Sequence, residues 1–277
     1  IFPAQRAFPQ NGLGINPATG PPTRMPTAAL LLAVAASVGA VRAADTAGTM
    51  LFRSGPAQTA LVELYSSEGC SSCPPAEAWL NRLGTSPGLW SAFVPVALHV
   101  NYWDRLGWRD PWASAEFTDR QHAYARTWRS DSVYTPAVVL NGQEWRVWSG
   151  HPSIPRATAN PGVLTARSTD GLRWEIEFTP TKTLDSVEAS IALLSRGLDS
   201  DVRAGENRGR QLHHDFVAIA LVTVPLAKSG NTFRGEAVIS RERAPRGGSL
   251  ALAAWVTSAG QLAPLQAVGG DLPAGRR

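Results

Sequence analysis

The chain has 277 residues, of which 44% are hydrophobic and 17% are charged, and its mean hydropathy is −0.11. This length allows one or two domains with a buried core, and the composition is typical of neither a disordered nor a membrane protein. The 26 basic and 22 acidic residues give a net charge of +4, but three of the arginines lie in residues 1–43, which contain no acid. The other 23 basic residues nearly balance the acids and do not cluster, which argues against a nucleic-acid partner.

Residues 1–43 have the pattern of a leader. Residues 27–41 are an uncharged, alanine-rich stretch that is too short to span a bilayer comfortably. Small residues at Val41 and Ala43 fit the −3 and −1 positions of a signal-peptidase site. We therefore predict a signal peptide at about residues 25–43, with Met25 as the true start, and an uncleaved anchor as the alternative. The mature protein is then periplasmic or secreted, with membrane contact only through an uncleaved leader.

The next region alternates between strand and helix patterns. Residues 59–65 and 93–100 are apolar runs typical of buried parallel strands, and residues 76–83 and 112–128 have helical spacing. Asn141-Gly142 then predicts a hairpin within residues 133–148. The resulting β-α-β-α-β-β order is that of a thioredoxin-like domain, which we place at residues 57–155.

Beyond a proline- and glycine-rich linker at residues 149–161, the pattern changes to short strands separated by turn residues. These strands are expected at residues 163–167, 172–178, 186–194, 216–224, 232–240 and 249–256. The predicted fold class is therefore α/β: a thioredoxin-like domain followed by a mainly antiparallel β, sandwich-like region at residues 160–275.

Both cysteines of the chain lie in one motif, Cys70-Ser-Ser-Cys73, where the first strand turns into the first helix. A disulfide that closes so short a loop stabilises a fold little, so redox chemistry is the better explanation. The helix N-terminus favours an anion and should lower the pKa of Cys70. We predict Cys70 as the attacking thiolate and Cys73 as the resolving cysteine.

Two further residues are candidates for the same chemistry. Pro136 follows Thr135 just before a strand, and we expect a cis peptide bond that lies opposite the cysteines and positions a substrate chain. Glu63 lies in the strand that leads to Cys70, and a buried acid there could exchange a proton with Cys73. Each residue also has a plain structural interpretation, as a strand-initiating proline and a solvent-facing acid.

Aromatic residues follow the second strand, at the same edge as the cysteines. We predict that Tyr102, Trp103 and Trp108, together with Thr135, line a cleft for a peptide or an apolar small molecule. Packing in the core is an equally good interpretation of the two tryptophans. The partner is then a protein or small-molecule thiol or disulfide, and no resident cofactor is expected. The neighbouring charges at residues 104–110 fit a local salt-bridged loop.

Two alternatives to a thiol–disulfide oxidoreductase stay open. The thiols could bind copper or zinc together with His99 or His151, although only the cysteines have ligand spacing, and no metal residue is assigned. His213 and His214 are adjacent in an expected strand and would face opposite ways. The protein could also be a non-enzymatic binding module with a passive disulfide.

Three segments together carry a family resemblance: residues 64–77 around Cys70-Ser-Ser-Cys73-Pro-Pro, residues 99–108, and Val133-Tyr-Thr-Pro136. They resemble a bacterial family of predicted secreted, thioredoxin-like proteins of unknown function. Residues 205–210, Gly-Glu-Asn-Arg-Gly-Arg, are similar to a signature in the second half of that family, although their composition is that of a polar turn. The resemblance spans residues 57–275 and implies export and the predicted fold, without implying a known reaction.

Overall fold

The computed structural model describes residues 48–150 and 153–273, so the predicted leader and His151 lie outside the described residues. The helices are α1 (Pro74–Arg82) and α2 (Ala115–Thr127), with 3-10 turns η1 (Leu83–Thr85), η2 (Asp104–Leu106) and η3 (Trp148–Gly150). The strands are β1 (Met50–Arg53), β2 (Ala60–Ser66), β3 (Phe93–His99), β4 (Ala137–Leu140), β5 (Gln143–Glu144), β6 (Gly162–Ser168), β7 (Arg173–Pro180), β8 (Val187–Arg196), β9 (Leu198–Asp201), β10 (Gln211–His214), β11 (Val217–Ser229), β12 (Thr232–Val238), β13 (Ser249–Ser258) and β14 (Pro264–Asp271).

The first half of the described chain is built around β2 and β3, which pair in parallel and are buried along their whole length. Strand β4 adds to the other edge of β2 in antiparallel orientation and turns back into β5. Asn141 and Gly142 both have positive φ in this turn, at 50° and 82°, which suits the twist of a two-residue hairpin. The predicted hairpin is confirmed, although its strands are shorter than expected.

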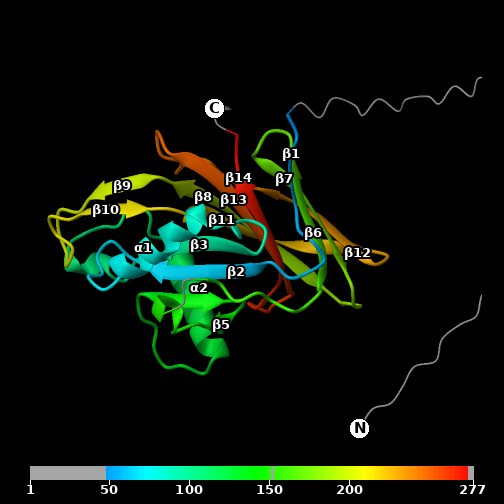
Figure 1. Cartoon of the computed structure of the whole chain (residues 1–277), viewed down its shortest axis with the longest axis horizontal. Helices are drawn as coiled ribbons and strands as arrows, with labels where there is room; N and C mark the ends of the chain where they lie inside the picture. Colours follow the sequence, from blue (N-terminus) through cyan, green and yellow to red (C-terminus); the bar gives the residue numbers. More distant parts are fainter. Residues whose placement is uncertain (1–47, 151–152, 274–277) are drawn as a thin grey trace, which may run out of the picture. The chain divides into compact units, whose positions relative to one another are not determined.

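Helices α1 and α2 contact opposite faces of β2, because successive strand side chains alternate between faces (Figure 1). Ser66 reaches Glu77 of α1 on one face, whereas Glu63 reaches Arg120 of α2 on the other. Ser114 is the N-cap residue of helix α2, and its hydroxyl accepts a hydrogen bond from the Glu116 amide. The cysteine motif is thus held between β2 and the first turn of α1.

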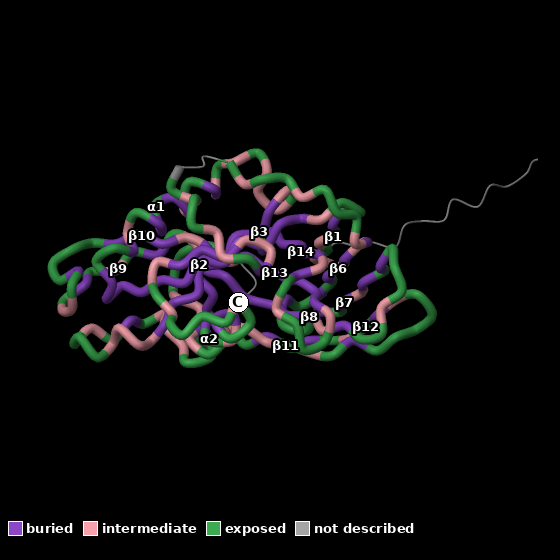
Figure 2. The backbone as a smooth tube through the Cα atoms, turned by 90° about the horizontal axis from the view of Figure 1, so that it is seen from below, coloured by how far each residue is buried: buried purple, intermediate pink, exposed green. Residues whose placement is uncertain are grey.

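The second half is antiparallel β structure arranged around a core of its own. Strand β7 alternates exposed and buried residues, as a strand with one solvated face does. It pairs with β6 and β12, and its buried residues Trp174, Ile176 and Phe178 pack in one cluster with residues of β8 and β13. Strand β13 itself is almost fully buried (Figure 2). The six strands expected in this half are confirmed, whereas β1, β9 and β14 were not predicted.

Strand β11 connects the two halves. At its first residue, Val217 pairs in parallel with Ala97 of β3, and the rest of β11 pairs with β8 and β12. The result is a 12-stranded mixed sheet with strand order β1-β6-β7-β12-β11-β3-β2-β4-β5, and with β8, β13 and β14 attached through β11.

This sheet shows that the predicted fold class was wrong. The structure is mostly β with one large mixed sheet, and it is not an α/β thioredoxin-like domain followed by a separate sandwich. The physical reason is that β3 is not an edge strand, because its free edge pairs with a strand more than a hundred residues later in the chain. The domain boundaries predicted at residues 155–160 stay a prediction.

Within residues 48–150 and 153–273, no helix is both long and apolar enough to cross a membrane.

Candidate functional site

Cys70 and Cys73 form a disulfide, with 5.5 Å between their Cα atoms. Cys70 lies in the loop after β2, and Cys73 is the N-cap residue of α1. Both cysteines are completely buried, whereas Ser71 and Ser72 between them are exposed. The bonded sulfurs are therefore close to the surface of the loop but are covered by its own residues and by those packed against it.

The segment before β4 lies next to this loop. The Thr135–Pro136 peptide bond is cis, as predicted. The Ser72 hydroxyl oxygen is 3.3 Å from the Cys70 sulfur and 3.4 Å from the Thr135 carbonyl oxygen. Trp103 donates a hydrogen bond from Nε1 to the Thr135 hydroxyl, at 2.8 Å. The structure therefore brings Cys70, Thr135 and Trp103 together at one place.

Trp103 and Trp108 are half-buried and pack against the cysteine loop. A Cβ atom at Gly69 would lie 3.1 Å from the Cβ atom of Trp103, so this residue covers the loop backbone closely. Trp108 donates a hydrogen bond from Nε1 to Glu68, at 2.7 Å, and Tyr102 donates one from its hydroxyl to Gln121, at 3.2 Å. Their assignment to a substrate cleft stays a prediction.

A shallow groove lies beside the cis-proline. It is lined by Tyr134, Pro136, Val138, Trp145, Arg146 and Trp148. Trp145 and Trp148 pack against Trp79 of helix α1, with ring centroids 5.7 and 5.6 Å apart. This aromatic groove therefore continues from Pro136 toward the helix that follows Cys73.

Residues 205–210 clamp the cysteine loop from outside, and we name them the clamp loop. The buried Asn207 side chain donates hydrogen bonds from Nδ2 to the carbonyl oxygens of Glu68 and Cys70, each at 2.8 Å. The Glu206 carboxylate accepts from the Ser71 amide at 3.0 Å and from its hydroxyl at 2.7 Å, and these bonds lower the pKa of Glu206.

The interpretation of residues 205–210 as only a polar turn was incomplete. Gly205 has φ of +73°, and a Cβ atom there would lie 3.3 Å from the Cβ atom of Trp108 and 3.7 Å from the Gly69 Cα atom. The family resemblance was the only signal in the sequence that marked this segment. Turn composition cannot indicate which distant loop a turn contacts.

Glu63 is fully buried on β2, but its partners come from the α2 face. Its carboxylate accepts hydrogen bonds from Arg120 Nε at 2.7 Å and from the Tyr124 hydroxyl at 2.6 Å. Burial and the Glu63 charge raise the pKa of Tyr124, so this phenol stays a proton donor. Among the described contacts of Glu63, none joins it to a cysteine, and its expected proton transfer with Cys73 stays a prediction.

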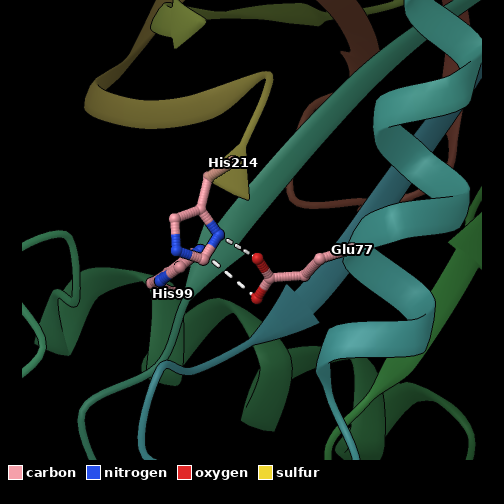
Figure 3. A group of neighbouring side chains, drawn as sticks. All are labelled: Glu77, His99 and His214. Atoms are coloured by element: carbon pink, nitrogen blue, oxygen red, sulfur yellow. Dashed lines mark hydrogen bonds and ion pairs between the residues drawn. The ribbon is translucent and has the colours of Figure 1, made fainter. Parts of the chain in front are cut away.

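A second acid, Glu77, occupies the face of the sheet that carries the disulfide. Glu77 of α1, His99 at the end of β3 and His214 of β10 meet at one buried point (Figure 3). Glu77 binds the Ser66 hydroxyl and His214 Nδ1, and its Oε1 is 3.8 Å from His99 Nε2. We name Glu77, His99 and His214 the buried triad.

A carboxyl group also lies at the outer side of each imidazole. His99 Nδ1 is 2.8 Å from Asp110 Oδ2, and His214 Nε2 is 3.2 Å from Glu68 Oε1. The interpretation of the loop around Asp110 was thus wrong, because Asp110 is buried against His99 and does not belong to a surface salt-bridged loop. His213 and His214 do face opposite ways, since His213 is exposed and binds Asp199.

The electrostatics of this network favour charged groups despite burial. Burial opposes protonation of His214, but Glu77 and Glu68 outweigh it and raise its pKa to about 10. Burial also opposes ionisation of Glu77, yet His214, His99 and Ser66 lower its pKa. The buried triad can therefore form ion pairs between protonated histidine and ionised Glu77. Alternatively, it can offer two imidazoles and a carboxylate to a metal ion.

Two solved structures are similar to this chain in fold. A structural-genomics crystal structure of a protein from Agrobacterium tumefaciens is 24% identical, with a TM-score of 0.54, over 77% of this chain and 94% of that chain. HBP35 of Porphyromonas gingivalis is 11% identical, with a TM-score of 0.53, over 79% of this chain and 76% of that chain. Identities this low indicate a shared fold alone.

No curated protein matches the chain. A family model described as "Protein of unknown function (DUF1223)" matches residues 61–257, which include the cysteine motif, the buried triad and the clamp loop. The chain therefore belongs to the DUF1223 family, whose function is unknown.

Proposed function

We propose that this protein is a thiol–disulfide oxidoreductase that acts through Cys70 and Cys73. The observation that carries the proposal is the disulfide at the start of α1, with the cis-proline segment and an aromatic groove beside it. A bond between cysteines three residues apart restricts the unfolded chain little, so stability alone is a weak reason for it. A helix N-terminus favours the thiolate that exchange requires.

The proposed exchange starts from the oxidised protein. A substrate thiolate attacks the Cys70 sulfur, the Cys70–Cys73 bond breaks, and the Cys73 thiolate leaves and takes up a proton. The second thiolate of the substrate then attacks the substrate sulfur that is bonded to Cys70. This step forms the substrate disulfide and releases the Cys70 thiolate. Two electrons pass from the substrate dithiol to the cysteine pair, and the reverse series reduces a substrate disulfide.

Access to the sulfurs needs a local rearrangement, because both cysteines are fully buried. Ser71 and Ser72 are exposed, and Glu206 of the clamp loop holds Ser71. Movement of these few residues would open the disulfide without unfolding α1. We also propose that the protein works in the periplasm or outside the cell, because a disulfide persists in an oxidising compartment and residues 25–43 resemble a signal peptide.

The complete burial of the disulfide also supports a second candidate function, a binding module with a passive disulfide. In that case the aromatic groove beside Pro136 binds a partner, and the cysteines only fix the loop. The two functions differ in the reactivity of the cysteines.

Cysteine variants test the oxidoreductase directly, with glutathione disulfide as the substrate. The reduced wild-type protein should convert it to glutathione and regain the Cys70–Cys73 bond. Cys73→Ser should stop at a mixed disulfide on Cys70, visible as one added glutathione by mass spectrometry, because no resolving thiol remains. Cys70→Ser should lose the exchange. Equal reaction of Cys70→Ser and wild type, or no reaction of either, would reject the proposal.

A further inference from the structure

Two ring nitrogens of the buried triad, His99 Nε2 and His214 Nε2, have no hydrogen-bond partner among the described residues, and His99 Nε2 is the one that faces Glu77. His99 Nε2 is completely buried, accepts or donates no hydrogen bond among the described residues, and points toward Glu77. A buried polar nitrogen without a partner costs stability, so such an atom calls for an explanation. One explanation is that the lone pair of this nitrogen serves a ligand that sits between His99 and Glu77.

The other nitrogen of His99 is already fixed. Asp110 holds Nδ1 at 2.8 Å, and Asp110 is itself held by the amides of Glu68 at 2.8 Å and Trp112 at 2.9 Å. A carboxylate on the outer nitrogen sets the tautomer and the ring orientation of an imidazole that binds a metal ion through its inner nitrogen. This arrangement leaves Nε2 of His99 directed into the triad.

His214 repeats the arrangement from the opposite side. Its Nδ1 contacts Glu77, and its outer Nε2 is 3.2 Å from Glu68, whose second carboxylate oxygen is held by Trp108 at 2.7 Å. Both imidazoles thus face Glu77 with one nitrogen and face a fixed carboxylate with the other. Three buried carboxyl groups, those of Glu68, Glu77 and Asp110, therefore surround the two imidazoles.

We propose that Glu77, His99 and His214 form a binding site for a divalent transition-metal ion, with Zn²⁺ as the chemically fitting ion. Two imidazole nitrogens and one carboxylate oxygen are a donor set that zinc accepts, and three protein ligands leave a fourth position open. The ligand atoms lie within 4.8 Å of one another. Bond lengths of about 2.0–2.1 Å place tetrahedral ligands roughly 3.3 Å apart, so small side-chain shifts close the site.

The proposed site is independent of the thiols. The two cysteine sulfurs are bonded to each other, and none of the three proposed ligands is a cysteine. Zinc binding should therefore persist in both redox states of Cys70–Cys73. This distinguishes the site from a copper or zinc site made by the thiols, and it does not rest on the proposed oxidoreductase function.

Zinc content of the purified full chain tests the site. The wild-type protein is treated with a chelator, equilibrated with Zn²⁺, freed of excess ion and measured by elemental mass spectrometry. One zinc per chain is expected for the wild type and for the double variant Cys70→Ser/Cys73→Ser. His214→Gln and Glu77→Gln should each retain less than about a tenth of the zinc. Asp110→Asn should bind zinc about 10–100-fold more weakly, because it loosens the outer support of His99.

His213→Gln is the matched control, because His213 is the exposed neighbour of His214 and points away from the triad. It should bind zinc like the wild type. Circular dichroism checks that each variant is folded, and Co²⁺ absorption in the wild type reports the ligand set even if a triad variant fails to fold. A wild-type protein that binds no zinc, a His214→Gln protein that binds as much as the wild type, or a Co²⁺ spectrum with sulfur ligation would overturn the proposal.

Discussion

Replacing Arg120 with methionine should lower the free energy of unfolding by about 3–5 kcal/mol, because it leaves the buried Glu63 carboxylate without its cation. Only 11% of the Arg120 side chain and 1% of the Glu63 side chain are exposed, and Arg120 Nε is 2.7 Å from Glu63 Oε1. Arg120 also lies over the rings of Tyr124 and Trp255, at 5.4 and 5.2 Å. Urea unfolding followed by tryptophan fluorescence measures the change.

Two variants separate the charge effect from lost packing. The double variant Glu63→Gln/Arg120→Met should be more stable than Arg120→Met, because no unpaired charge remains and the new amide oxygen can still accept a hydrogen bond from Tyr124. Arg173→Met removes an exposed ion pair with Glu236 and should change stability by at most about 1 kcal/mol. If Arg120→Met lowers the free energy of unfolding no more than Arg173→Met does, the Glu63–Arg120 pair does not stabilise the core.

The second large effect is expected at Asn207. Asn207→Ala should destabilise the protein by about 1–3 kcal/mol, because the buried Glu68 carbonyl oxygen loses its donor and the Cys70 carbonyl oxygen keeps only the Cys73 amide, at 3.2 Å. It should also speed reduction of the Cys70–Cys73 disulfide by dithiothreitol at least about tenfold, since only Glu206 of the clamp loop then still binds the cysteine loop. Timed alkylation of the released thiols, measured by mass spectrometry under native conditions, gives the rate.

Glu206→Ala is the control within the same loop. It removes the two exposed bonds to Ser71 and should cost less stability than Asn207→Ala, with a reduction rate between those of the wild type and Asn207→Ala. An Asn207→Ala protein that is reduced no faster than the wild type would mean that the clamp loop does not limit access to the sulfurs.

Local features of the fold were predictable where a short pattern has one physical solution. The apolar run of β3, the turn at Asn141-Gly142 and the alternation in β7 each determine one element. The fold class was not predictable in this way, because it depends on which strand pairs with the second edge of β3. Val217 and Ala97 are far apart in the sequence, and neither carries a local signal for the other.

The same distinction between local and long-range features applies to the candidate site. The disulfide and the cis-proline follow from motifs of a few residues. The buried triad combines Glu77, His99 and His214 from three elements, and each looks ordinary in its own segment. The adjacent histidines at 213 and 214 gave a partial signal, since strand alternation requires that one of them faces inward.

The most direct test of the proposed function is the reduction potential of Cys70–Cys73. The wild-type protein is equilibrated in glutathione redox buffers and, for lower potentials, in dithiothreitol redox buffers, and the fraction of disulfide is read by alkylation and mass spectrometry. An exchange centre should have a potential of about −270 to −120 mV, the range of known thiol–disulfide oxidoreductases. A potential below about −300 mV would identify a structural disulfide and contradict the proposed function.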